Sequence, residues 1–168
     1  NIEDLRNTLN SLDCDVILTS GGVSMGEFDY VRKLMEEEGE LHFWKVAMRP
    51  GGPPLFGMWN NTPLFGLPGN PVSSHLVFTL LVAPWLSPEI PLVKNVKVLM
   101  KDSVKGAPGK VCFRRISISL ENGELVGTTH THQGSGNIHS MVAHNGLTYL
   151  PPNTDANVGE FIDALWLI

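Results

Sequence analysis

Two short stretches of the chain combine glycines with hydroxyl side chains, the groups that hold anions in proteins. They read "TSGGVSMGEFDY" and "GLPGNPVSSH". Glycines let successive backbone N–H groups face one concave site, and a helix N-terminus adds partial positive charge. We therefore predict that both stretches bind an oxyanion such as a phosphate. The candidate ligand-binding residues are Ser20, Gly21, Gly22, Ser24 and Gly26 in the first stretch, and Pro68, Gly69, Asn70, Pro71 and Ser73 in the second.

The second stretch has an ordinary interpretation as well. Asn70 can cap a helix that starts at Pro71, and a bare N-P-x-S sequence more often marks only a capped core helix. The functional interpretation rests on the two stretches occurring together. The first one follows a buried strand, at the end of a strand where α/β domains place their ligands.

Three charged side chains near these stretches suit an anion site. Asp29 lies at the start of a helix, where a carboxylate either contributes to a ligand site or complements the helix dipole. Lys45 and Arg49 lie four residues apart in "LHFWKVAMR". Strand alternation predicts both on one face, roughly 13 Å apart. Isolated cations on a strand are more often solvated, so both interpretations stay open for this pair.

The elements that position these residues alternate between helix and strand, which predicts an α/β half. After it the chain changes to short strands separated by glycine-rich or polar turns, which predicts a small all-β module. The predicted order is a helix over 2–12, a buried strand in "DVILTSGG", a helix over 28–38, a strand in "LHFWKVAMR", two strands about a turn at Asn60 and Asn61, and a helix from Pro71. The predicted domains are 1–86 and 94–168, joined by a linker at 87–93.

Composition excludes several classes of protein. The 168 residues are 42% hydrophobic and 17% charged, and we expect no membrane span. A net charge of −5 makes nucleic acid an unsuitable partner. Cys14 and Cys112 are the only cysteines, which fits a reducing cytoplasm. The chain starts without methionine, and we expect it to be a piece of a longer protein.

The histidines raise a zinc hypothesis, which the sequence does not favour. Alternation would put His130 and His132 on one strand face, near His139 or His144. Neither a cysteine nor a second regular ligand pair accompanies them. We therefore expect these histidines to be structural.

Three motifs, "SGGVSMGEFDY", "FWKVAMRPG" and "FGLPGNPVSS", occur in the same order and at similar spacings in a known family. With them the chain resembles the molybdopterin molybdenumtransferases, the MoeA and gephyrin E-domain family. The resemblance continues more loosely through "CFRR", "THQGSGNIHSM" and "NGLTYLPPNT". It implies the C-terminal half of a Mog-like three-layer α/β domain with a mostly parallel sheet, which binds molybdopterin, followed by a small β-barrel domain.

The resemblance also implies an activity and a site. Members insert molybdate into adenylylated molybdopterin and hydrolyse the adenylate with the help of a divalent cation, here Mg²⁺, and they work as homodimers. By motif position Asp29, Lys45 and Arg49 would be catalytic, and Asp29 would also be a metal ligand. Arg115 and Ser135 would face the ligand cleft, a role that rests on the resemblance alone.

Two features depart from the family pattern. Gly52 stands where the family commonly has lysine, which removes a phosphate contact. The first half of the α/β domain is missing, so we expect the chain to carry half of a catalytic site, to be inactive alone and to self-associate. The alternatives are a non-catalytic molybdopterin-binding domain and a gephyrin-like peptide-binding scaffold.

Overall fold

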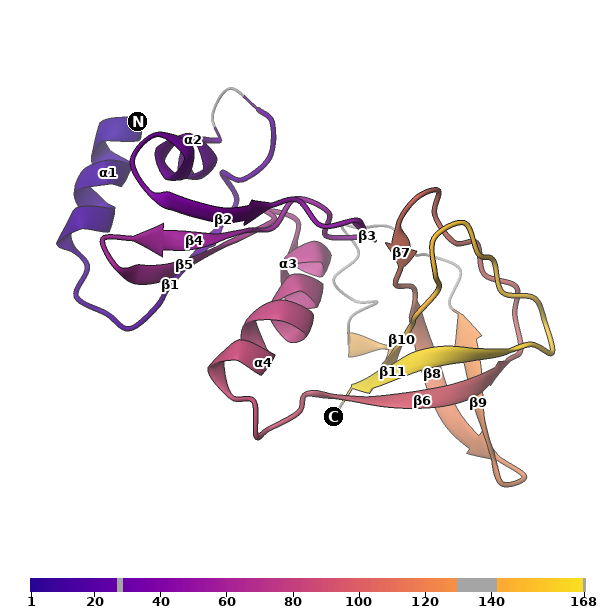
Figure 1. The fold of residues 1–168 in the computed structure, drawn as a ribbon. Coiled ribbons are helices and arrows are strands. Elements are labelled where there is room, and N and C mark those ends of the chain that lie inside the picture. The colour runs from indigo at the N-terminus through magenta and orange to yellow at the C-terminus, as the bar shows by residue number, and fades with distance from the viewer. Residues whose placement is uncertain (27–28, 130–141, 168) are drawn as a thin grey trace. The chain divides into compact units, whose positions relative to one another are not determined.

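A computed structural model describes residues 1–26, 29–129 and 142–167 of the chain, which form two compact units. The first unit contains Asn1–Val46 and Gly51–Phe78, and the second contains Ala47–Pro50 and Thr79–Ile168. Figure 1 shows the order of the elements along the chain. The unit changes at Phe78, inside a helical run, whereas the predicted linker at 87–93 and the domain limits beside it stay predictions.

The first unit is a four-stranded sheet with helices on both faces (Figure 1). Helices α1 and α2 lie on one face and α3 lies on the other. Its elements are α1 (Ile2–Ser11), β1 (Ile17–Ser20), α2 (Tyr30–Glu37), β2 (Glu40–Trp44), β4 (Leu55–Trp59), β5 (Thr62–Leu67) and α3 (Pro71–Val77). No helix within the described residues is both long and apolar enough to cross a membrane.

Local sequence explains most of these elements. Asn1 caps α1 by accepting the N–H of Asp4 at 2.9 Å, and the buried Leu9 lies on the apolar stripe of that helix. Asn60 and Asn61 both adopt left-handed backbone, with φ of 47° and 64°, which asparagine tolerates in the tight turn between β4 and β5. The predicted helices and this hairpin are confirmed.

The strand order is β1-β5-β4-β2. Strands β1 and β5 pair in parallel, whereas β5 with β4 and β4 with β2 pair antiparallel. The resemblance implies a mostly parallel sheet, but the described strands form one parallel pair and two antiparallel ones. The two-residue turn at Asn60 and Asn61 explains the β4–β5 pair, because such a turn can only join antiparallel strands.

The single strand predicted over "LHFWKVAMR" is wrong. Strand β2 ends at Trp44, and Lys45 has a φ of 72°, which breaks the extended backbone. A second short strand, β3 (Met48–Arg49), then pairs in parallel with β7 (Val111–Cys112) in the second unit. Lys45 and Arg49 therefore do not share one face of one strand, since the alternation that predicted it does not continue through Lys45.

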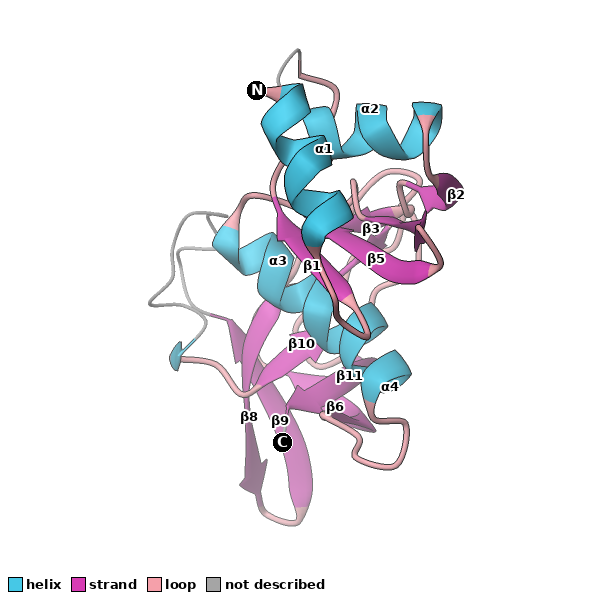
Figure 2. Ribbon diagram, turned by 90° about the vertical axis from the view of Figure 1, so that its left-hand side faces the viewer, coloured by secondary structure: helices cyan, strands magenta, loops and turns pink. Residues whose placement is uncertain are grey.

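The second unit contains a closed five-stranded barrel of order β10-β11-β6-β9-β8 (Figure 2). Within it β6 and β9 pair in parallel, and the other pairs are antiparallel. The predicted α/β domain followed by a small β-barrel is confirmed. The elements of this unit not yet given are the π-helical turn η1 (Phe78–Val82), whose first residue belongs to the first unit, α4 (Ala83–Leu86), β6 (Val93–Met100), β8 (Arg115–Glu121), β9 (Glu124–Thr129), β10 (Gly146–Thr148) and β11 (Phe161–Leu167).

Candidate functional site

The parallel pairing of β1 and β5 brings the two predicted anion-binding stretches together. Ser20 pairs with Leu67 at the last position of both strands, and the N–H of Gly21 donates to the carbonyl of Leu67 at 2.9 Å. A Cβ built on Gly69 would lie 3.5 Å from the Cα of Gly21. The two glycine turns therefore touch, and a side chain at either position would occupy the space between them.

The start of α3 is closed by its own cap. The Oδ1 of Asn70 accepts the N–H groups of Val72 at 3.1 Å and Ser73 at 3.3 Å. The hydroxyl of Ser74 donates to the carbonyl of Pro68, which fixes the turn before the helix. The predicted cap at Asn70 with Pro71 at the first helical position is confirmed. The N–H groups of Val72 and Ser73, which the sequence predicts to be available to an anion, are instead hydrogen bonded within the protein.

The loop 21–26 is held in place along its length. Gly21 and Gly22 have φ of 90° and 72°, in the left-handed region that favours glycine. The carbonyl of Gly22 accepts the N–H of Arg32 at 3.0 Å. At the other end, the Oδ2 of Asp29 accepts the N–H of Gly26 at 2.5 Å. Asp29 makes no side-chain bond to the first turn of α2, so it stabilises the loop and does not cap the helix.

Some loop donors remain for a ligand. Within the described part of the chain, the backbone N–H groups of Gly22 and Ser24 donate no hydrogen bond, and neither do those of Gly69 and Asn70. Ser20, Ser24 and Gly69 are exposed. These are the donors that the predicted anion site would use.

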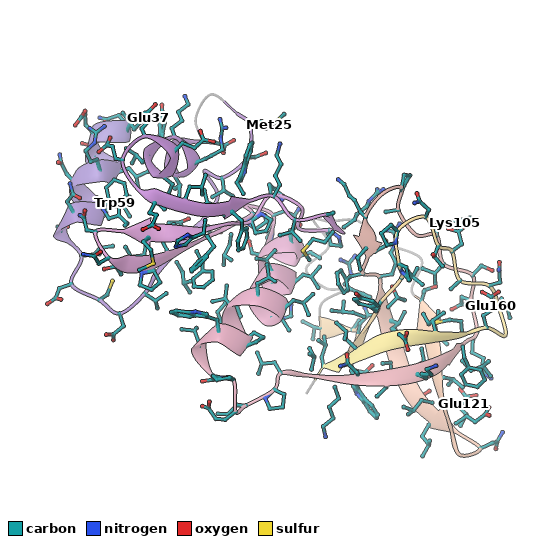
Figure 3. The ribbon with its side chains drawn as sticks, in the orientation of Figure 1. Met25, Glu37, Trp59, Lys105, Glu121 and Glu160 are labelled. Carbon is teal, nitrogen blue, oxygen red and sulfur yellow. The ribbon has the colours of Figure 1, made fainter. Side chains whose placement is uncertain are left out.

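Lys45 lies at the same edge of the sheet. Strand β2 runs in the same direction as β1 and β5, because two antiparallel pairings separate it from β5. Its carboxyl end, at Trp44, therefore lies at the same edge of the sheet as the carboxyl ends of β1 and β5. The Nζ of Lys45 lies 3.2 Å from the Sδ of Met25 in the glycine-rich loop, and Figure 3 labels Met25 on that loop.

The two predicted arginines belong to the second unit. Arg49 is exposed, and its carbonyl accepts the N–H of Phe113 at 2.8 Å. Arg115 is buried in β8, and burial lowers the pKa of its guanidinium, with a smaller contribution from the charge of Arg114. Ser135, the remaining predicted ligand residue, lies outside the described residues.

A magnesium site is compatible with Asp29, although the described residues do not form a complete one. They contain no cluster of three or more histidine, cysteine or acidic side chains that could hold a metal ion. Mg²⁺ commonly binds one or two carboxylates together with substrate phosphates. The second carboxylate oxygen of Asp29 would be one such ligand. For the zinc hypothesis, His144 is buried, and the other three histidines lie outside the described residues.

Sequence reasoning missed Trp44, Val23 and Gly66. The indole Nε1–H of Trp44 donates to the carbonyl of Val23 at 2.7 Å, and Val23 is only 1% exposed. A Cβ on Gly66 would collide with the Cγ1 of Val23. Glycine inside a strand marks a close approach of another group, and this was the signal available in "LFGLPG".

Comparison with protein families identifies both parts of the chain. A family model described as "Probable molybdopterin binding domain" matches residues 1–88. A second model, "MoeA C-terminal region (domain IV)", matches residues 97–167.

Curated relatives agree with these models. The chain is 34% identical over 142 residues to a molybdopterin molybdenumtransferase of Haemophilus influenzae, covering 78% of this chain and 34% of that protein. It is 36% identical over 146 residues to the Bacillus subtilis protein of the same name, covering 83% and 34%. It is 34% identical to the molybdenum cofactor synthesis protein cinnamon of Drosophila melanogaster, covering 89% and 27%. The chain thus spans about a third of the length of these relatives.

Solved structures show the same fold. Two structures of the molybdopterin biosynthesis MoeA protein from Pyrococcus horikoshii match with TM-scores of 0.74 and 0.66, at 25% and 26% identity. Both alignments cover 98% of this chain, and they cover 40% and 38% of the solved chains.

Proposed function

This chain belongs to the MoeA family of molybdopterin-binding proteins, and on that premise we propose that it forms part of a molybdopterin molybdenumtransferase. In this function molybdate is inserted into adenylylated molybdopterin, and hydrolysis of the adenylate releases AMP. One observation carries the proposal: the sheet brings two glycine turns and Lys45 to one edge. Amide donors and an ammonium group suit substrates that are themselves anions.

The residues have separate proposed roles. The free N–H groups of Gly22 and Ser24 and the ammonium of Lys45 bind phosphate or molybdate oxygens. Asp29 holds the loop through Gly26 and offers its other oxygen to Mg²⁺. Bound Mg²⁺ would neutralise charge on the phosphate oxygens. Positioning of this kind, without a covalent nucleophile, is the contribution that the chain makes to the reaction.

By family motif position we further propose Arg49, Arg115 and Ser135 as ligand-binding residues, a proposal that rests on the resemblance alone. We also propose that the protein acts as a homodimer in the cytoplasm. The exposed, unpaired thiol of Cys14 fits a reducing compartment. Light scattering on the purified protein measures the oligomeric state directly.

Calorimetry tests the anion-binding role of Lys45. We expect Lys45→Ala to weaken binding of molybdopterin about tenfold or more, because a charge-assisted contact contributes ~1.5–3 kcal/mol. Lys33→Ala is the matched control, since Lys33 also lies over an aromatic ring, that of Tyr30 at 5.6 Å, but on α2. Equal affinities of the parent chain and Lys45→Ala would remove Lys45 from the site.

The activity itself is tested by molybdate-dependent release of AMP from adenylylated molybdopterin. We expect a protein of the relatives' full length to turn over and this chain alone not to. Turnover by the chain alone at a comparable rate would contradict the proposed division of the site.

A further inference from the structure

One aromatic side chain links the glycine-rich loop to the cations beside it. The indole of Trp44 donates its Nε1–H to the carbonyl of Val23 at 2.7 Å. The Nζ of Lys45 lies 3.9 Å from the centroid of the indole ring. The guanidinium carbon of Arg32 lies 4.6 Å from it. A single half-buried residue therefore contacts both the loop and the proposed ligand cation.

The register of the sheet explains why Trp44 can reach the loop. Trp44 pairs with Leu55, and Leu55 pairs with Gly66, so the three residues face the same side of the sheet. Gly66 lacks a side chain, and Val23 fills that space, where a Cβ would overlap it. The indole N–H then donates to the carbonyl of Val23 from the end of β2, two strands away from Gly66 in the sheet. The loop therefore packs against the sheet through the side chain of Val23 and is hydrogen bonded to Trp44 through the carbonyl of Val23.

The backbone at Lys45 fixes the direction of its side chain. Lys45 has a φ of 72°, and its N–H donates to the carbonyl of Pro54 at 2.9 Å. An exposed lysine normally samples many rotamers and loses that entropy when it binds. Here the ammonium already lies between the ring of Trp44 and the Sδ of Met25, 3.2 Å from the sulfur. Contact with the ring restricts the side chain before any ligand arrives.

We propose that Trp44 is a positioning residue that orders the loop 21–26 through its N–H and holds the Lys45 ammonium beside that loop through its ring. The proposal rests on the proposed function, in which this loop and Lys45 bind the oxyanion substrate. Trp44 itself touches no substrate. Its effect on affinity comes from the lower conformational freedom of the two groups that do.

Two variants separate the two contacts of the indole. Trp44→Phe keeps a ring beneath Lys45 but removes the N–H, and Trp44→Leu removes both. Trp59→Phe is the matched control, because the Nε1 of Trp59 also donates a hydrogen bond, to the Oδ1 of Asn10 at 3.1 Å, and Trp59 is buried in the same sheet. Figure 3 shows that Trp59 lies beside α1, on a strand that does not carry the loop.

NMR of the whole chain provides a readout independent of catalysis. We expect the loop amides of Gly21, Gly22 and Gly26 to shift in both Trp44 variants, and the hydrogen-bonded amides of Gly21 and Gly26 to exchange faster. The side-chain CεH₂ signals of Lys45 should lie upfield because of the ring current. That upfield shift should persist in Trp44→Phe and disappear in Trp44→Leu. Trp59→Phe should leave both sets of signals as they are in the parent chain.

Calorimetry with sodium molybdate measures the consequence for binding. We expect Trp44→Leu to bind molybdate about two- to fivefold more weakly, the size of a cation–π contact at an exposed site. Trp59→Phe should bind as the parent does. Unchanged affinity in Trp44→Leu, unchanged Lys45 signals, or an equal loss in Trp59→Phe would each overturn the proposal. A parent chain that binds no molybdate contradicts the proposed function instead, and the NMR spectra then decide whether Trp44 orders the loop and Lys45.

Discussion

Replacement of Gly66 by alanine tests how the glycine-rich loop is seated on the sheet. Gly66 is buried in β5, and a Cβ there would overlap the Cγ1 of Val23 and lie 3.2 Å from the Cβ of Leu55. Val23 is 1% exposed and Leu55 is 1% exposed, so neither side chain can move into solvent without losing its packing. The added methyl group must therefore displace the loop or strain the sheet.

The expected cost follows from two opposing effects. Overpacking of a close-packed core costs about 1–3 kcal/mol. Alanine in place of glycine stabilises by about 0.4–1 kcal/mol through the unfolded chain. We expect Gly66→Ala to lower the free energy of unfolding of the first unit by about 1–2 kcal/mol. That corresponds to a fall of about 4–16 °C in the melting temperature of a domain of this size.

A double-mutant cycle with Val23→Ala assigns the effect to the collision. Val23→Ala alone should destabilise by about 1–3 kcal/mol, because it removes buried methyl groups and leaves a cavity. In the double variant the new methyl group occupies that cavity. The double variant should lose less free energy of unfolding than the two single variants lose together, by about 1 kcal/mol or more. A difference of this size is within the coupling seen for residues in contact.

The assay is urea denaturation of the whole chain, followed through NMR signals of the first unit. Signals of the barrel serve as the internal control, because the substitution lies outside that unit. Gly66→Ala with unchanged or increased stability would refute the reasoning. Strict additivity of the two substitutions would do so as well, since it would show that Gly66 and Val23 do not share one space.

Three further outcomes are expected. Asp29→Asn keeps an acceptor for the N–H of Gly26, so the free energy of unfolding should change by less than about 1 kcal/mol. The affinity for Mg²⁺, measured by NMR titration, should fall. An unchanged Mg²⁺ affinity would exclude Asp29 as a metal ligand. The hydrogen bond from Lys105 lowers the pKa of Asp155 from its ordinary value of 3.8, so its stabilising contribution is present above that value and is lost as pH falls through the folded-state pKa. Denaturation at pH 7 and pH 3 should show a weaker pH dependence in Asp155→Asn, and an identical dependence would contradict this. Asn145→Ala should destabilise the barrel by about 2 kcal/mol in urea denaturation, because Asn145 both donates to and accepts from the backbone of β8, and a neutral result would show that water replaces both bonds.

The sequence by itself determined the elements whose causes are local. Apolar spacing predicted the first helix, and the asparagine pair at 60–61 predicted the hairpin. The cap at Asn70 and the change to short strands in the second half of the chain could be predicted in the same way. These features depend on residues within a few positions of one another, where capping, turn geometry and periodicity act directly.

The tertiary structure decided which of these local features meet. Parallel pairing of Ser20 with Leu67 joins turns that lie far apart in the sequence. Lys45 reaches the loop because its backbone leaves the strand, which alternation could not predict. The bond from Trp44 to Val23 depends on the missing side chain of a glycine two strands away. Such contacts arise from register and packing between distant segments, and the residue types alone do not specify them.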